Sequence, residues 1–341
     1  MRHNARMLEN MTSPLRQVLA RQVRQLAGDS RAALDFTQPA GDPGWFGPDS
    51  VSWRVHADFV AMMTGGVAAL LFQALHPLAL AAVWDYSDFR ADLRGRLHRT
   101  ALFIATTTYG PSAAAQAAVD RVRAIHARVR GTAPDGRPYA ADDPHLLTFI
   151  HIAEVYCFAS AYDGLVSRLS DAQRDAYVDE MARVPLALGA QDVPRDWAGL
   201  LAAVQKYQPE LRGGPRPQAI LRLLRSMASH PQSRPATLSA VGRLQTALGG
   251  RVNDVPVKLM VQAAGSLLPG PARELYGLSD TSMLPTAAAL AALRACVPLM
   301  RWALRDGVAA QARRRVGAVL IRHGQHFVSR LPHGDALVRY G

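Results

Sequence analysis

At 341 residues the chain is long enough for one large domain or two ordinary ones. Hydrophobic residues make up 49% of it and charged residues only 19%, which is typical of a mostly helical globular protein with a large buried core. The formal net charge is +12, from 39 basic against 27 acidic residues, and this suits phosphate, anionic lipid or an acidic protein without selecting among them. No run resembles a base-contacting motif, so we expect no nucleic-acid partner.

The two cysteines, Cys157 and Cys296, each lie within an apolar run. Two isolated cysteines make no disulfide framework, and a zinc site would need further ligands at short spacing. No Cys-x-x-Cys-His occurs, which excludes a covalently attached c-type haem. A reducing, cytoplasmic setting is therefore expected.

Both ends of the chain are basic. Residues 1–28 have no continuous apolar core and no small-residue cleavage site, so they do not resemble a secretory signal and fit a helix better. Residues 301–330 place Arg313, Arg314 and Arg315 beside an apolar run. The two ends predict loose, salt-sensitive peripheral attachment to anionic membrane surfaces, with a solvated basic face as the alternative.

A Gly- and Pro-rich loop at 40–50 leads into residues 51–83, the most apolar part of the sequence. Residues 60–83 contain no Asp, Glu, Lys or Arg, which meets the length criterion for a transmembrane helix. His76 and Pro77 argue against a simple span, because a proline breaks or kinks a helix. We expect a long buried helix that ends near His76, with a membrane segment as the alternative.

The remaining segments repeat helical spacing, with loops between them. Helices are expected at 93–109, at 146–166 after the Asp143-Pro144 start, at 170–188 with Ser170 as cap, at 217–247, at 255–268, and in a last pair ending in the Ala-Arg-Arg-Arg run. Residues 132–143 form a loop. We find no internal repeat and no convincing alternating strand. The predicted fold is all-α: an amino-terminal helix and loop at 1–50, then one large helical domain at 51–341 with a globin-like or bundle-like core.

The segment 113–130 carries the most informative helix. Val119, Val122, Ile125 and Val129 recur at three- and four-residue steps and share one side of it. His126 falls within this apolar seam, and Gly131 is expected to end the helix. An inward imidazole on a basic helix predicts either a metal or haem ligand or a hydrogen-bonded core histidine.

Three other elements contribute polar groups from apolar surroundings: His76 beside Pro77, the run Arg96 to Thr100, and His151. Arg96, Arg99 and Thr100 lie three and four residues apart and form one patch on a helix. Two guanidinium groups with a hydroxyl suit carboxylates such as haem propionates, or bound dioxygen. The alternative is that both arginines lie at the surface and Thr100 bonds its own helix.

Three other kinds of site do not fit the sequence. A di-iron carboxylate site needs two Glu-x-x-His motifs, whereas the chain offers only the reversed order from His151 to Glu154. Neither Gly-x-Ser-x-Gly nor the phosphate-binding loop Gly-x-x-x-x-Gly-Lys-Ser/Thr occurs.

The order of five runs resembles one known family. These runs are LFQALHPLALAAVWDYSDFR, RLHRT, VRAIHARVRG, GRPYAADDPHLLTFIH and LSDAQRDAYVDEM. Together they resemble the family of the rubber oxygenase (latex-clearing protein) and the fungal MpaB oxygenase, over residues 53–188. The resemblance implies an all-helical fold, a non-covalent haem b, and the use of dioxygen to cleave carbon–carbon double bonds in isoprenoid chains.

The resemblance also implies roles for single residues. His126 matches the family's proximal haem ligand, and Arg96, Arg99 and Thr100 match its distal pattern of arginine, lysine and threonine. Arg99 stands where the pattern has lysine, and an arginine cannot act as a deprotonated iron ligand. The family's catalytic glutamate has no counterpart before Arg96. His76 and His151 are expected in the pocket wall or around it.

The sequence therefore predicts a haem b-dependent oxygenase that acts with dioxygen on a hydrophobic, isoprenoid-like small molecule. His126 would bind the iron and Arg96 the haem, with Arg96, Arg99 and Thr100 as the catalytic group. Two alternatives remain: a non-catalytic haem-binding protein, and a cofactor-free basic helical protein at membrane surfaces.

Overall fold

The computed structural model describes residues 34–227, 257–278 and 283–322, and most of these are helical. The helices are α2 (Val51–His56), α3 (Phe59–Gln73), α4 (Pro77–Tyr86), α5 (Leu93–Tyr109), α6 (Ser112–His126), α7 (Pro144–Leu165), α8 (Asp171–Met181), α9 (Arg183–Leu188), α10 (Trp197–Tyr207), α11 (Pro215–Met227), α13 (Gly270–Leu275), α14 (Met283–Ala303) and α15 (Val308–Arg322), with a further helix at 257–266. Short 3-10 turns, η1 (Asp88–Arg90) and η2 (Gln208–Glu210), follow α4 and α10. The all-α prediction is confirmed.

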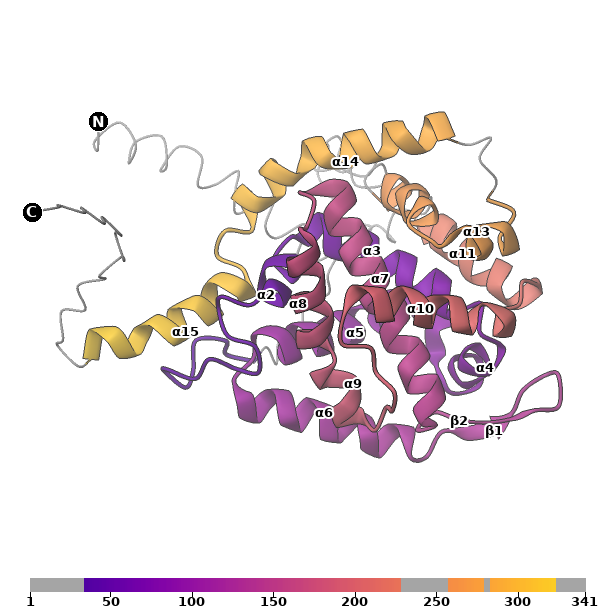
Figure 1. The fold of residues 1–341 in the computed structure, drawn as a ribbon, viewed down its shortest axis with the longest axis horizontal. Helices are drawn as coiled ribbons and strands as arrows, with labels where there is room; N and C mark the ends of the chain where they lie inside the picture. Colours follow the sequence, from indigo (N-terminus) through magenta and orange to yellow (C-terminus); the bar gives the residue numbers. More distant parts are fainter. Residues whose placement is uncertain (1–33, 228–256, 279–282, 323–341) are drawn as a thin grey trace, which may run out of the picture.

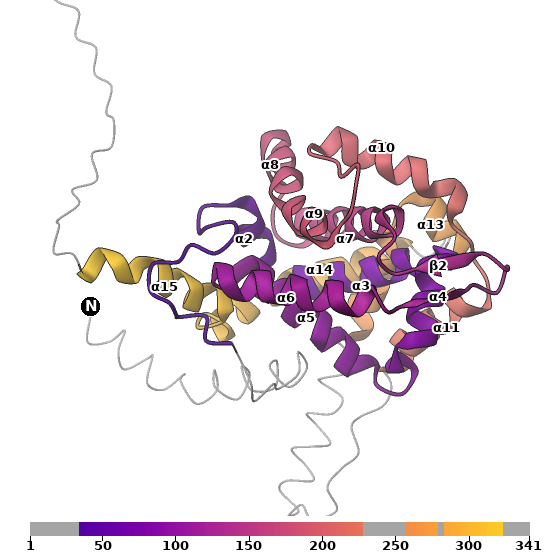
Figure 2. The same ribbon diagram turned by 90° about the horizontal axis from the view of Figure 1, so that it is seen from below.

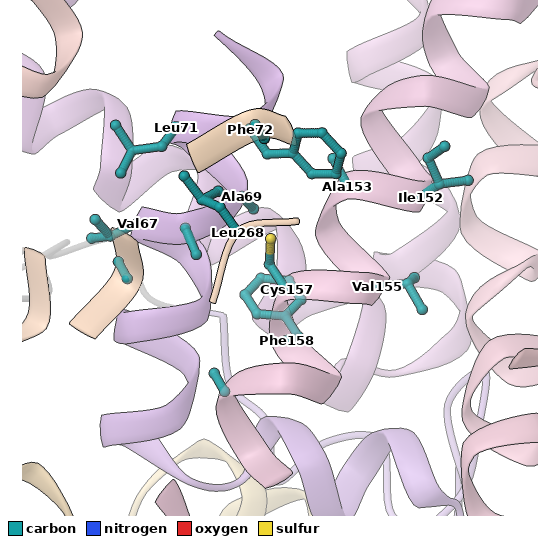
Figure 3. Close-up of a cluster of buried hydrophobic side chains, with 14 of the residues drawn as sticks. Val67, Ala69, Leu71, Phe72, Ile152, Ala153, Val155, Cys157, Phe158 and Leu268 are labelled. Carbon is teal, nitrogen blue, oxygen red and sulfur yellow. The ribbon is translucent and has the colours of Figure 1, made fainter. Parts of the chain in front are cut away.

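Helices α3 and α7 form the centre of the core. They pack against each other along most of their length, and their facing side chains are almost wholly apolar (Figure 3). The two helices approach closely at Gly65, where an added Cβ would lie 2.8 Å from the ring of Phe158 and 3.1 Å from the carbonyl oxygen of Cys157. A glycine is therefore required there by the neighbouring helix.

Gly65 and its neighbour Gly66 provide a matched test of this packing. At Gly66 an added Cβ would meet only Phe158, at 3.8 Å, so Gly66→Ala should stabilise the fold by up to about 1 kcal/mol through helix propensity. Gly65→Ala should instead cost about 1–2 kcal/mol, because overpacking outweighs the same gain in propensity. Urea unfolding of both variants measures the difference. Equal effects at the two positions would contradict the close approach.

The apolar segment 51–83 bends twice. Asp58 begins α3, and the chain turns by 105° between α3 and α4, where Pro77 is the first residue of α4 and His76 caps it. The helix is predicted to end near His76, and α3 ends three residues earlier, at Gln73. Pro77 then starts a new helix in another direction, as its effect on helices predicts. Within the described residues no single helix is long and apolar enough to cross a membrane, although two bent pairs together pass that test: α3 with α4, and residues 286–303 with 308–317.

Helices α5 and α6 form an antiparallel hairpin joined by Gly110 and Pro111 (Figure 2). The bounds of α5 match the predicted 93–109. The helix predicted over 113–130 is wrong at its end, because α6 stops at His126. Strand β1 (Arg130–Thr132) follows and pairs antiparallel with β2 (Pro138–Ala140), so that Gly131 lies opposite Tyr139 rather than ending a helix.

One residue predicted to lie on the buried side of α6, Ile125, does not lie there. Ala115 and Val119 are fully buried, and Val122 and His126 continue their stripe, half-buried. Ile125 is 54% exposed, because it lies beside this stripe rather than on it. The inward direction of His126 therefore holds, while Ile125 does not share it.

The carboxyl-terminal half of the chain packs around this core. Ser170 caps α8 in a capping box with Gln173, as its sequence predicts, and Pro185 falls within the separate short helix α9. Helix α14 packs on α3 and α7 along one edge of the molecule, with α6 and the β-hairpin at the opposite edge (Figure 1). The helix predicted at 1–28, and the predicted helix beyond residue 227, lie outside the described residues.

Helix α15 changes the interpretation of the basic run at 313–315. Arg313 and Arg314 are exposed, but Arg315 is fully buried. Its guanidinium group donates hydrogen bonds to the carbonyl oxygens of Asp42 (2.7 Å), Phe36 (3.1 Å) and Gly110 (3.3 Å). The run is therefore not a uniform solvated or membrane-facing patch, and membrane attachment by the chain ends stays a prediction.

Candidate functional site

The hairpin of α5 and α6 carries four predicted site residues: Arg96, Arg99, Thr100 and His126. Arg96 precedes Gly110 by fourteen residues, and His126 follows Pro111 by fifteen. Because each helix rises about 1.5 Å per residue, both residues lie about 21 Å along their own helices from the turn. The arginines therefore belong to the first half of α5 and the imidazole to the end of α6, both at the open end of the hairpin.

His126 is half-buried, and its Nδ1 atom is buried without a hydrogen-bond partner among the described residues. Burial lowers the pKa of its imidazole, while the nearby Asp142 carboxylate raises it. A ring that stays neutral at physiological pH is the form that binds a metal ion.

The α5 residues form the expected patch but differ in their partners. Arg96 is half-buried and donates a 3.0 Å hydrogen bond to the hydroxyl of Ser87. Burial lowers the pKa of its guanidinium group, and the neighbouring charge of Arg99 lowers it further. Arg99 is exposed and lies 3.7 Å from the carboxylate of Asp92, and Thr100 is exposed as well. Arg99 can be redirected easily, because an exposed ion pair of this length contributes little stability.

His151 belongs to a second group of polar residues, on α7. The side chain is buried, Nε2 has no partner among the described residues, and burial lowers the pKa to about 3. One turn later, burial raises the pKa of Glu154 to about 7, opposed in part by a hydrogen bond from Gln73. A carboxyl group with such a pKa can hold or release a proton near neutral pH.

His76 belongs to a different element from this hairpin and has polar partners of its own. The His76 ring lies at the start of α4, where Nε2 is 3.1 Å from the Glu210 carboxylate, and Glu210 also contacts His145. Glu210 and His145 carry no sequence signal that would connect them, because 65 residues separate them. Glu154 appears in the sequence only as part of a reversed di-iron motif. The unusual pKa of Glu154 follows from its burial, which the sequence does not reveal.

His56 shows what a structural histidine looks like in this fold. It is buried, with Nδ1 2.9 Å from the Thr108 hydroxyl and Nε2 2.9 Å from the Tyr177 hydroxyl. Both ring nitrogens are satisfied, and burial lowers its pKa to about 3. Among the described residues, His126 Nδ1 and His151 Nε2 lack partners and so differ from this pattern, since buried polar atoms are normally hydrogen-bonded.

Comparison with models of known families identifies the family of this chain. A sequence model described as "ER-bound oxygenase mpaB/B'/Rubber oxygenase, catalytic domain" matches residues 53–302. The chain belongs to this family. The match extends well beyond the predicted 53–188 and includes all of the predicted site residues. No curated protein and no solved structure matches the chain significantly.

Membership of the mpaB/rubber oxygenase family supports an oxygenase activity, which implies a small-molecule substrate and dioxygen. The residues of the α5–α6 hairpin fit a haem group chemically. His126 offers a neutral imidazole whose buried Nδ1 has no partner among the described residues, and Arg96 and Arg99 offer positive charge for carboxylates.

A cavity elsewhere in the protein is a weaker candidate for the functional site. Its volume is about 400 Å³, and it is lined by Trp45, Phe46, Asp179, Glu180, Arg183, Leu186 and Arg195. The charged groups there already have partners. Arg195 pairs with Asp179 at 2.7 Å, and Glu180 accepts bonds from the backbone nitrogens of Val51 and Ser52, at the start of α2. These contacts indicate a structural role.

Proposed function

We propose that the protein is a haem b-dependent oxygenase that uses dioxygen to oxidise a hydrophobic substrate of the isoprenoid class. The observation that carries the proposal is the half-buried imidazole of His126, whose Nδ1 has no partner among the described residues, on a helix that packs against α5 in a chain of an oxygenase family.

Each residue has a role that its surroundings support. His126 would hold the iron, because its ring is kept neutral by burial and directed by the end of α6. Arg96 is desolvated and would bind a haem carboxylate through its guanidinium group. Arg99 and Thr100 would orient dioxygen by charge and by hydrogen bonds. When bound, haem supplies the redox chemistry that activates dioxygen.

The remaining groups would shape the pocket and manage protons. Glu154 takes the proton-holding role in the proposal, because no carboxyl group before Arg96 matches the family's glutamate and Glu154 is held near neutral pKa by burial. His151 would line the pocket one turn away, and His76 is a more remote candidate.

Oxygen uptake by haem-loaded protein tests this function. A linear isoprenoid with internal double bonds should cause uptake and yield products with new carbonyl ends, whereas its fully saturated analogue of equal length should not. Haem binding without uptake on any unsaturated substrate would instead support a non-catalytic haem-binding protein. Absence of haem binding would support the cofactor-free alternative.

A further inference from the structure

Three element ends meet at a cluster of two histidines and a glutamate. His76 caps α4, His145 lies in the first turn of α7, and Glu210 belongs to η2. The His76 Nε2 atom is 3.1 Å from Glu210 Oε2, and the His145 Nε2 atom is 2.9 Å from both carboxylate oxygens. The three candidate ligand atoms all lie within 4.8 Å of one another.

The surroundings hold these side chains in place. The backbone nitrogen of Arg212 donates a 2.8 Å bond to the Leu75 carbonyl oxygen, which ties the residues after η2 to the start of α4. The Tyr207 hydroxyl donates a 2.9 Å bond to the His145 carbonyl oxygen, and the two rings lie 4.5 Å apart. Contacts from Arg212 and Tyr207 therefore help to hold the cluster in place, in addition to the contacts among its own three side chains.

His145 is held so that its Nε2 atom faces the Glu210 carboxylate. The Tyr207 hydroxyl lies 3.2 Å from His145 Nδ1, on the other side of the ring. Nε2 lies 2.9 Å from both carboxylate oxygens. An imidazole nitrogen and carboxylate oxygens are atoms of the kinds that bind metal ions.

We propose that His76, His145 and Glu210 form a binding site for a divalent transition-metal ion of the Zn²⁺ type. Two imidazoles and a carboxylate are a known zinc ligand set that leaves a further position for water. Imidazole ligands favour such ions over Ca²⁺ and Mg²⁺. His76 is buried while His145 is exposed and Glu210 half-buried, so an ion can enter from solvent and reach all three.

Binding would connect three elements. His76 Nδ1 lies 3.5 Å from the Ala79 nitrogen, so Nε2 is the ring atom that faces Glu210 and would bind the ion. Protons compete with the ion for the imidazole nitrogens, so binding weakens as the pH falls. The bound ion would link the starts of α4 and α7 to η2. This site lies on other elements than the α5–α6 hairpin, and it does not depend on the proposed oxygenase activity.

Titration of the full, chelator-treated chain with Zn²⁺ tests the site by calorimetry and by melting temperature. The chain has 11 histidines, so variants identify the site. His145→Ala and Glu210→Gln should each remove one bound Zn²⁺ per chain, or weaken that step at least about tenfold. His98→Ala, a histidine of α5 outside the cluster, should bind like the wild type.

Further readouts separate metal binding from loss of fold. Co²⁺ should give the ligand-field absorption of a low-coordinate nitrogen and oxygen site in wild type and His98→Ala, and not in the two cluster variants. Circular dichroism should show all four proteins equally helical without metal. Wild-type Zn²⁺ stoichiometry in both His145→Ala and Glu210→Gln, or no Zn²⁺ binding by the wild type, would overturn the proposal.

Discussion

Arg315→Ala should destabilise the protein by about 3–5 kcal/mol, the largest loss of stability that we expect from one side chain in the described residues. The fully buried guanidinium group joins the carbonyl oxygens of Phe36, Asp42 and Gly110, from the amino-terminal loop and the α5–α6 turn. Removing it leaves three buried acceptors without a donor. Arg315→Lys should recover little, because an ammonium group cannot reproduce the planar arrangement of donors.

The adjacent Arg314 provides the control, since it has the same chemistry, occupies the same helix and is exposed. Arg314→Ala should change the free energy of unfolding by no more than about 0.5 kcal/mol. Urea unfolding measures both values, and limited proteolysis should cut residues 34–50 faster in Arg315→Ala alone. Equal stabilities of the two variants would contradict the buried role of Arg315.

His126→Ala should lose most of the haem, with affinity at least about tenfold lower, because the side chain proposed to hold the iron is removed. Arg99→Ala should retain most of the haem, because Arg99 is exposed and leaves the imidazole intact. Thr100→Ala should behave like Arg99→Ala, and both should change oxygen chemistry. Haem titration followed by absorption ranks the three variants.

The ranking also tests the assignment of the ligand. Full haem occupancy in His126→Ala, together with loss of haem in His151→Ala or His76→Ala, would move the iron site to another element. Such a result would not affect the family membership, because the membership rests on the match over residues 53–302.

Local signals predicted much of the fold. Pro77 marked the bend after α3, Ser170 marked the start of α8, and the spacing of apolar residues gave both ends of α5. Each of these features depends on residues close in sequence. The family resemblance rested on the order of several such runs, and for that reason it identified the family correctly.

Errors arose where two local signals competed. Val129 and Arg130 continue the helical pattern of α6, but Pro134, Asp135 and Gly136 form a tight turn that pairs β1 with β2. Gly136 has a positive φ, as this kind of hairpin requires. This turn requires strand pairing on both sides, so the helix has to end before Val129, and it ends at His126.

Other features depend on tertiary contacts. The run at 313–315 gives no sign that one arginine is buried, although Ala312 and Arg315 share the inner face of α15 at helical spacing. Glu210 and His145 meet only because η2 returns to the starts of α4 and α7. The near-neutral pKa of Glu154 likewise follows from burial between helices, which no spacing within α7 reveals.

The central claim is that this oxygenase-family protein binds haem b through His126. The visible absorption spectrum of the full chain, purified after expression with ample haem, tests it most directly. We predict a Soret band in the wild type, greatly reduced in His126→Ala, with haem that acidic solvent extracts because no Cys-x-x-Cys-His attaches it. A wild-type protein with no Soret band that also fails to bind added haem would contradict the account.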